Sequence, residues 1–173
     1  MDLRETILQE HSKRQMQKIV RWVGNDPKRF SALVKLFLHG EYRVTQRAAW
    51  PISYCIEAHP ELARPWLKKM LLKTKEPGVH DAVKRNVLRL LQEVNIPKSL
   101  QGLTAKISFD FLQDAREPIA VRVFSMSVLA NIAPNEPGLK NELRLVVEDM
   151  MPLESAAIQA RGRKILKQLK SPV

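Results

Sequence analysis

The sequence contains few of the residues that build enzyme active sites and metal centres. Cys55 is the one cysteine among 173 residues, so an internal disulfide and a zinc site made of thiolates are both excluded. The six glycines are spread along the chain, and no two of them share a phosphate-binding loop. The four histidines never stand three or four residues apart, as two metal ligands on one helix face would. We therefore predict a protein without catalytic residues, bound metal or cofactor.

Long apolar runs are missing as well. The longest uncharged run covers residues 123–135 and contains Ser, Asn and Pro, whereas a membrane helix needs about 18 apolar residues. The first ten residues include acidic side chains and no apolar stretch, so we expect no signal peptide. With 45% hydrophobic residues, the chain is apolar enough to bury the core of one domain. These features predict a reduced, cytoplasmic protein with no membrane span.

Helix signals run almost from end to end. Ser12 and Gln15 form a capping box before an apolar stripe, and Asp26 precedes Pro27 as the N-cap of the next helix. Gly40 is expected to end that helix in the left-handed conformation. Further helices are predicted over residues 43–58, 61–75, 79–95, 98–114, 118–133, 138–151 and 155–170. Because the loops between them are short, neighbouring helices should be antiparallel.

An arginine recurs early in every second helix, with separations of 38, 37 and 39 residues. These four positions are Arg47, Arg85, Arg122 and Arg161. An amphipathic helix pair cannot cover its own apolar face, so successive pairs must stack and share a core. We therefore predict an all-α protein of about four helix pairs. Its single domain, 1–173, would comprise an N-terminal helical cap at 1–26 and repeats at 27–59, 60–95, 96–133 and 134–170.

Two of these second helices carry a family resemblance. Segments 83–88 (Val-Lys-Arg-Asn-Val-Leu) and 120–124 (Ala-Val-Arg-Val-Phe) resemble HEAT repeats, in which an apolar residue and Arg precede small or aliphatic residues. The tetratricopeptide pattern matches less well because its period is shorter. The resemblance covers about residues 27–170 and implies a right-handed, armadillo-like α-α superhelix. An irregular helical bundle is the alternative fold, and it would leave the regular spacing unexplained.

Basic residues outnumber acidic ones by 29 to 18, which gives a net charge of +11. The predicted second helices hold eight more basic than acidic residues, and the resemblance implies that these helices line the concave side of the stack. A wall with one sign of charge attracts polyanions, so we predict a basic binding groove there. Its candidate residues are Arg43, Arg47, Lys84, Arg85, Arg89, Arg122, Arg161, Arg163, Lys164 and Lys167, with Trp50 as an aromatic candidate beside Arg47.

The four periodic arginines have an alternative role. In HEAT-like stacks this arginine often bridges to an acid in a turn of its own or the adjacent repeat. We favour such an internal ladder over ligand contact for them, since a buried guanidinium is normally paired. The acids available four to seven residues upstream are Glu41, Asp81, Glu117 and Glu154. The unpaired positions that remain as better contact candidates, or as a solvated helix face, are Lys84, Arg89, Arg163, Lys164 and Lys167.

Three further expectations concern single residues. The tryptophans at positions 22, 50 and 66 lie on apolar stripes, so core packing is favoured over stacking on bases. Cys55 lies mid-helix and is expected to be a packed hydrophobe. Asp81, next to His80, is expected to act as a helix N-terminal cap or turn partner rather than to orient a catalytic histidine.

Three functions remain open at this point. A non-catalytic scaffold that binds an acidic protein surface is favoured, by analogy with other helical solenoids. A nucleic-acid binder that contacts the phosphate backbone is the first alternative. The second is a HEAT-like DNA alkylation-repair glycosylase. Glycosylases of that family use Trp, Arg and a carboxylate on a basic surface, and Trp50 with Arg47 supplies two of these.

Overall fold

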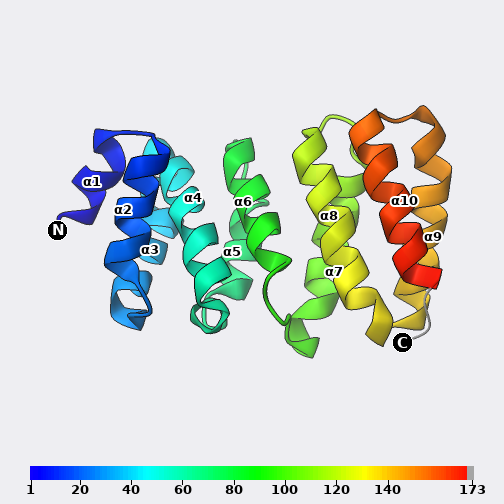
Figure 1. Ribbon diagram of the computed structural model, residues 1–173, viewed down its shortest axis with the longest axis horizontal. Coiled ribbons are helices and arrows are strands. Elements are labelled where there is room, and N and C mark those ends of the chain that lie inside the picture. Colours follow the sequence, from blue (N-terminus) through cyan, green and yellow to red (C-terminus); the bar gives the residue numbers. More distant parts are fainter. Residues whose placement is uncertain (171–173) are drawn as a thin grey trace. The chain divides into compact units, whose positions relative to one another are not determined.

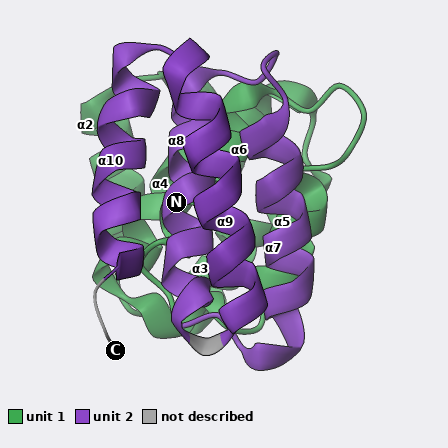
Figure 2. Ribbon diagram, turned by 90° about the vertical axis from the view of Figure 1, so that its right-hand side faces the viewer, with its two compact units in different colours: residues 1–94 green, residues 95–173 purple. Residues whose placement is uncertain are grey.

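The computed structural model describes residues 1–170, apart from the side chain of Asn135, and this part of the chain forms helices and no strand (Figure 1). The all-α prediction is therefore confirmed. The last three residues of the predicted domain lie outside the described residues. The chain divides into two compact units, unit 1 at Met1–Val94 and unit 2 at Asn95–Val173 (Figure 2).

Unit 1 is built from three successive helix pairs. The pairs are α1 (Leu3–Gln9) with α2 (Lys13–Val23), α3 (Pro27–His39) with α4 (Tyr42–Ala58), and α5 (Leu67–Lys73) with α6 (Asp81–Leu91). A short 3-10 helix, η1 (Pro60–Ala63), precedes α5. The second helices pack on one another, α2 on α4 and α4 on α6, and they lie side by side in Figure 1. The first helices α3 and α5 also touch, so each pair covers the apolar face of the next.

Unit 2 repeats the arrangement with two pairs. They are α7 (Lys98–Gln113) with α8 (Ile119–Ile132), and α9 (Pro137–Met150) with α10 (Ala156–Lys170). Two 3-10 turns, η2 (Ala133–Asn135) and η3 (Met151–Leu153), flank α9. Again the second helices α8 and α10 pack together. Their shared core includes Phe109, Met126, Leu129, Leu143 and Ile165, all buried.

The predicted helix starts are observed in unit 1. The Asp26 carboxylate accepts hydrogen bonds from the backbone N–H groups of Lys28 and Arg29, at 2.8 and 3.2 Å. Ser12 Oγ likewise accepts from the N–H of Gln15 at 3.1 Å. The capping box is only half formed, however, because the Gln15 side chain turns away and donates to the carbonyl of Thr6 at 2.6 Å. Gln15 thereby ties α2 to α1, a helix that the sequence analysis did not delimit.

Two local predictions are wrong. A single helix over 61–75 does not form: the chain makes tight i→i+3 bonds from Leu62 to His59 and from Trp66 to Ala63, and α5 begins only at Leu67. Pro65 explains this, because it has no N–H to donate to the carbonyl one helical turn earlier. Gly40 is not left-handed either, with φ −72°. Glycine is needed there because a Cβ would overlap the carbonyl oxygen of Leu36 and lie 2.8 Å from Val44 Cγ1.

Candidate binding surface

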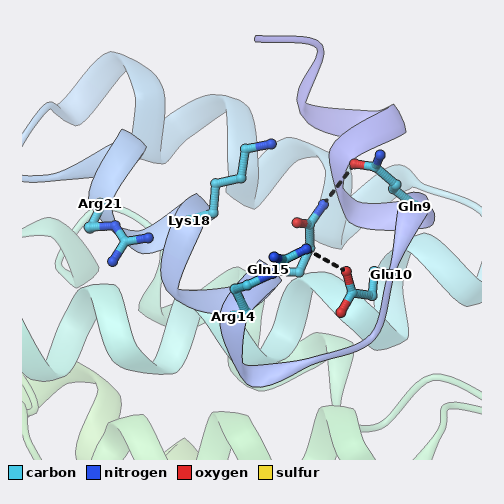
Figure 3. A pocket seen from close by; sticks show the side chains of 6 residues that line it. All are labelled: Gln9, Glu10, Arg14, Gln15, Lys18 and Arg21. Atoms are coloured by element: carbon cyan, nitrogen blue, oxygen red, sulfur yellow. Dashed lines mark hydrogen bonds and ion pairs between the residues drawn. The ribbon is translucent and has the colours of Figure 1, made fainter.

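Three basic side chains form a stripe on α2. Arg14, Lys18 and Arg21 are spaced by four and three residues and therefore share one helix face. They border a polar cavity of about 380 Å³ that is completed by Gln9, Glu10 and Gln15. Figure 3 shows the three cationic side chains emerging from successive turns of α2. We call Arg14, Lys18 and Arg21 the α2 basic stripe.

The stripe has little negative charge to balance it. The one acid at the cavity, Glu10, lies 3.7 Å from Arg14 in an exposed pair, and exposed pairs of this kind contribute at most about 1 kcal/mol. Lys18 and Arg21 form no ion pair with any residue between positions 1 and 170. An incoming acidic group can therefore bind without first displacing a strong internal partner.

Arg47 lies on α4 and holds α1 in place. Its Nη1 donates to the carbonyl oxygens of Ile7 and Leu8, at 3.3 and 2.8 Å, in the last turn of α1. A guanidinium satisfies the free carbonyls and complements the negative end of the helix dipole at such a site. Arg47 is thus structural, although its partner is a helix end rather than the acid Glu41, which pairs with Arg4 at 2.5 Å.

Two histidine rings pack against aromatic residues of α4. The ring of His11 packs against Trp50 with centroids 5.4 Å apart, and the ring of His80 packs against Tyr42 at 5.9 Å. Burial lowers the pKa of His11, and the positive charges of Arg47 and Arg85 lower that pKa further.

Arg85 departs from the predicted ladder. It is exposed on α6 and makes no hydrogen bond or ion pair within the described part of the chain. The acid four residues before it, Asp81, lies 3.8 Å from Lys84 instead. Asp81 is not the helix cap: His80 is, with Nδ1 accepting from the N–H of Ala82 at 2.9 Å.

Arg122 is the periodic arginine that does form the expected ladder. It is 5% exposed on α8, and its Nε donates to the carbonyl of Leu112 at 2.9 Å. Both of its terminal nitrogens donate to the carboxylate of Glu154, which belongs to the following pair. Bidentate contact of this kind is a strong form of ion pair. Arg161 also reaches the neighbouring helix, but its partner is the hydroxyl of Ser127 at 3.0 Å.

Three of the predicted contact residues, Lys84, Arg89 and Lys167, have interaction partners. Arg89 lies 2.7 Å from Glu57 and stacks over the ring of Tyr54, and Lys84 lies near Asp81. The sequence analysis missed Glu57 because it is 32 positions from Arg89, whereas Asp81 lies only three positions before Lys84 and was expected to pair with Arg85. Arg43 on α4 is exposed, and so are three basic residues of α10 in unit 2, namely Arg163, Lys164 and Lys167.

The tryptophans are half-buried rather than part of the core. The guanidinium of Arg29 lies over Trp22 at 5.3 Å, and the ammonium of Lys69 lies over Trp66 at 5.4 Å. The ring of Trp50 contacts that of His11. A large ring on the edge of an apolar stripe can bury one face and leave the other accessible, which periodicity alone does not reveal.

A comparison with family models decides the family. The sequence model of the HEAT repeat domain matches residues 3–169, nearly the whole chain. The chain belongs to the HEAT repeat family. This confirms the predicted α-α solenoid class, and the match includes α1 and α2 as well as the four later pairs. Comparisons with curated proteins and with solved structures each returned no match.

HEAT repeat domains are typically non-catalytic, and membership suggests a protein-interaction scaffold. In this HEAT repeat protein, neither Arg47 nor Trp50 contacts a carboxylate within residues 1–170. Over the same residues, no three His, Cys, Asp or Glu side chains come together as a metal site would require. No helix in the described chain is long and apolar enough to cross a membrane.

The sequence analysis of this HEAT repeat protein overlooked the α2 basic stripe and His11. The predicted binding residues all lie in the repeats from residue 27 onward, whereas the stripe lies in the predicted cap at 1–26. The signal was nevertheless present, because residues 13–23 contain four basic side chains and no acid, three of them at helical spacing. A search for one-sided charge on every amphipathic helix would have found the stripe.

Proposed function

We propose that this HEAT repeat protein is a non-catalytic scaffold that binds an acidic segment of a partner protein through the basic side of unit 1. The observation that carries the proposal is the α2 basic stripe, three exposed cations around one cavity with a single weakly held carboxylate. The single, unpaired Cys55 supports placement in the reducing cytoplasm.

Exposed positive charge attracts nucleic acid as well as acidic protein, and what separates the two is the spacing of the ligand's charge. Duplex DNA presents a regular line of phosphates and releases counterions on binding, so its affinity falls steeply with salt. The cations of the stripe share one small cavity on one short helix, an arrangement that matches a short cluster of carboxylates.

The test is a fluorescence-anisotropy titration with three probes: an acidic peptide rich in Asp and Glu, a duplex DNA and a single-stranded RNA. At an ionic strength of about 0.15 M we expect the peptide to bind more tightly than either nucleic acid. Replacing Arg14, Lys18 and Arg21 together by Ala should weaken peptide binding by about tenfold or more, equivalent to about 1.4 kcal/mol.

The matched control removes the same charge from first helices, with Lys28, Lys35 and Lys68 changed to Ala. All three are exposed on α3 or α5. This control should change peptide affinity by less than about twofold, since none of the three lysines lines the cavity beside the stripe. Equal losses in both variants, tighter binding of nucleic acid, or no binding of the peptide would each overturn the proposal.

A further inference from the structure

The cavity beside the α2 basic stripe holds more positive charge than one carboxylate would neutralise. The three cations of the stripe share this cavity with one acid, Glu10, so its positive charges exceed its negative ones by two. Two further acids near the chain start, Asp2 and Glu5, line a second cavity that shares only Gln9 with the first. A ligand group that carries two negative charges would balance the first cavity, whereas a carboxylate supplies one.

The three cations can reach one ligand group. Their positions share one face of α2, and at the rise of an α-helix the Cα atoms of Arg14 and Arg21 are about 10 Å apart, with Lys18 between them (Figure 3). The side chain of Arg14 is 85% exposed and pairs with Glu10 at 3.7 Å. Lys18 and Arg21 have no ion-pair partner among residues 1–170. Each cationic group is therefore free to turn towards a ligand in the cavity that all three line.

The two neutral side chains of the cavity are hydrogen-bonded to each other. Gln15 is buried, and its Nε2 donates to the carbonyl of Thr6 at 2.6 Å and to Gln9 Oε1 at 3.2 Å (Figure 3). The Nε2 group of Gln9 makes no hydrogen bond in the described chain, so it is a further donor at the cavity. Every side chain that lines the cavity is thus polar or charged. Such a lining suits an anionic group on a short side chain.

We infer that this cavity is a subsite for the phosphate group of a phosphoserine or phosphothreonine in the acidic partner segment. The inference rests on the proposed function and specifies the ligand. A phosphate monoester carries about −1.5 to −2 charges at neutral pH and three acceptor oxygens. Guanidinium groups bind phosphate through paired hydrogen bonds and lysine binds it as a point charge, so the α2 basic stripe supplies donors for all three oxygens. The ring of a phosphotyrosine would need an apolar wall, which a polar lining does not provide.

The test compares three peptides of one acidic sequence, with Ser, phosphoserine or Asp at the central position. By fluorescence anisotropy at an ionic strength of about 0.15 M, the phosphopeptide should bind about tenfold more tightly than the Asp peptide. Lys18→Gln should reduce this preference to less than about threefold, because it removes one of the two excess charges. The matched control is Lys13→Gln, also exposed on α2 but not among the residues that line the cavity, and it should keep the full preference.

The carboxylate of Glu10 provides a second test at the same cavity. It is the negative charge that a bound phosphate would meet, and it lies 3.7 Å from Arg14. Glu10→Gln should strengthen binding of the phosphopeptide more than binding of the Ser peptide, because the repulsion grows with the charge of the ligand. An equal effect on the two peptides would contradict a phosphate in this cavity.

The outcomes separate this inference from the proposed function. Equal affinities of the phosphopeptide and the Asp peptide, both lost when the α2 basic stripe is replaced by Ala, would overturn the phosphate subsite and leave the scaffold proposal standing. Absence of binding by all three peptides would overturn both. Free O-phosphoserine at the peptide's concentration should not displace the phosphopeptide; displacement would show a site for any small phosphate and overturn the inference.

Discussion

At the scale of single residues, the four periodic arginines hold different positions in the same repeat. Arg122 is buried and paired, Arg47 and Arg161 are half-buried and bound to neutral oxygens, and Arg85 is exposed and free. A recurring residue type therefore predicts a recurring location on the helix. It does not predict a recurring partner, because the partner comes from a different turn in each repeat.

This difference predicts contrasting effects of the same substitution. Arg122→Ala should destabilise the fold by about 3–5 kcal/mol, because it leaves the largely buried carboxylate of Glu154 without its partner. Arg85→Ala should change the free energy of unfolding by less than about 0.5 kcal/mol, as is usual for surface positions. Urea unfolding of both variants measures this. Similar losses in the two would show that Arg85 belongs to the ladder after all.

At the scale of helices, two glycines differ in whether a side chain could replace them. Gly40 joins α3 to α4 where a Cβ would meet the backbone of Leu36 and the side chain of Val44. Gly102 lies inside α7, where a Cβ would meet nothing within 4 Å. The same residue is thus required at a close contact and is dispensable in an open helix.

We expect Gly40→Ala to destabilise the protein by about 1–3 kcal/mol, since the added methyl group forces a backbone shift. Gly102→Ala should stabilise it by about 1 kcal/mol through higher helix propensity. Thermal and urea unfolding of the two variants provide the measurement. An unchanged free energy of unfolding for Gly40→Ala would show that the connection between α3 and α4 accommodates the methyl group.

A contact within or between these helices could be predicted from the sequence when its two residues lie close together along the chain. The N-caps at Ser12 and Asp26 were predictable because donor and acceptor lie within three residues. The contact of Arg47 with the end of α1 joins positions about 40 apart, and the pairing of Arg89 with Glu57 joins positions 32 apart. Such contacts depend on how the pairs stack, which periodicity places only approximately. The α2 basic stripe was local and could have been predicted.

At the scale of the whole molecule, the chain consists of two compact units with different numbers of helix pairs. Unit 1 stacks three pairs and unit 2 stacks two. In repeat proteins stability is roughly a sum of pair stabilities and of interfaces between neighbours. Unit 1 contains one internal interface more than unit 2, so it should be the more stable of the two. A single domain over 1–173 stays a prediction.

We therefore expect a fragment of residues 1–94 to fold alone and to unfold at a higher urea concentration than a fragment of residues 95–173. Circular dichroism during urea titration of both fragments, with the full chain as the reference, measures this. An unfolded 1–94 fragment beside a folded 95–173 fragment would contradict the additive account of the stack.

The burial of Cys55 in α4 has a practical consequence. Its thiol is 1% exposed, and burial raises its pKa to about 12, so the reactive thiolate is scarce while α4 stays packed. Reagents that alkylate thiols will modify this HEAT repeat protein only during transient openings of unit 1. Since the sequence has no second cysteine, the rate of alkylation at Cys55 reports how often unit 1 opens, and no probe needs to be introduced to measure it.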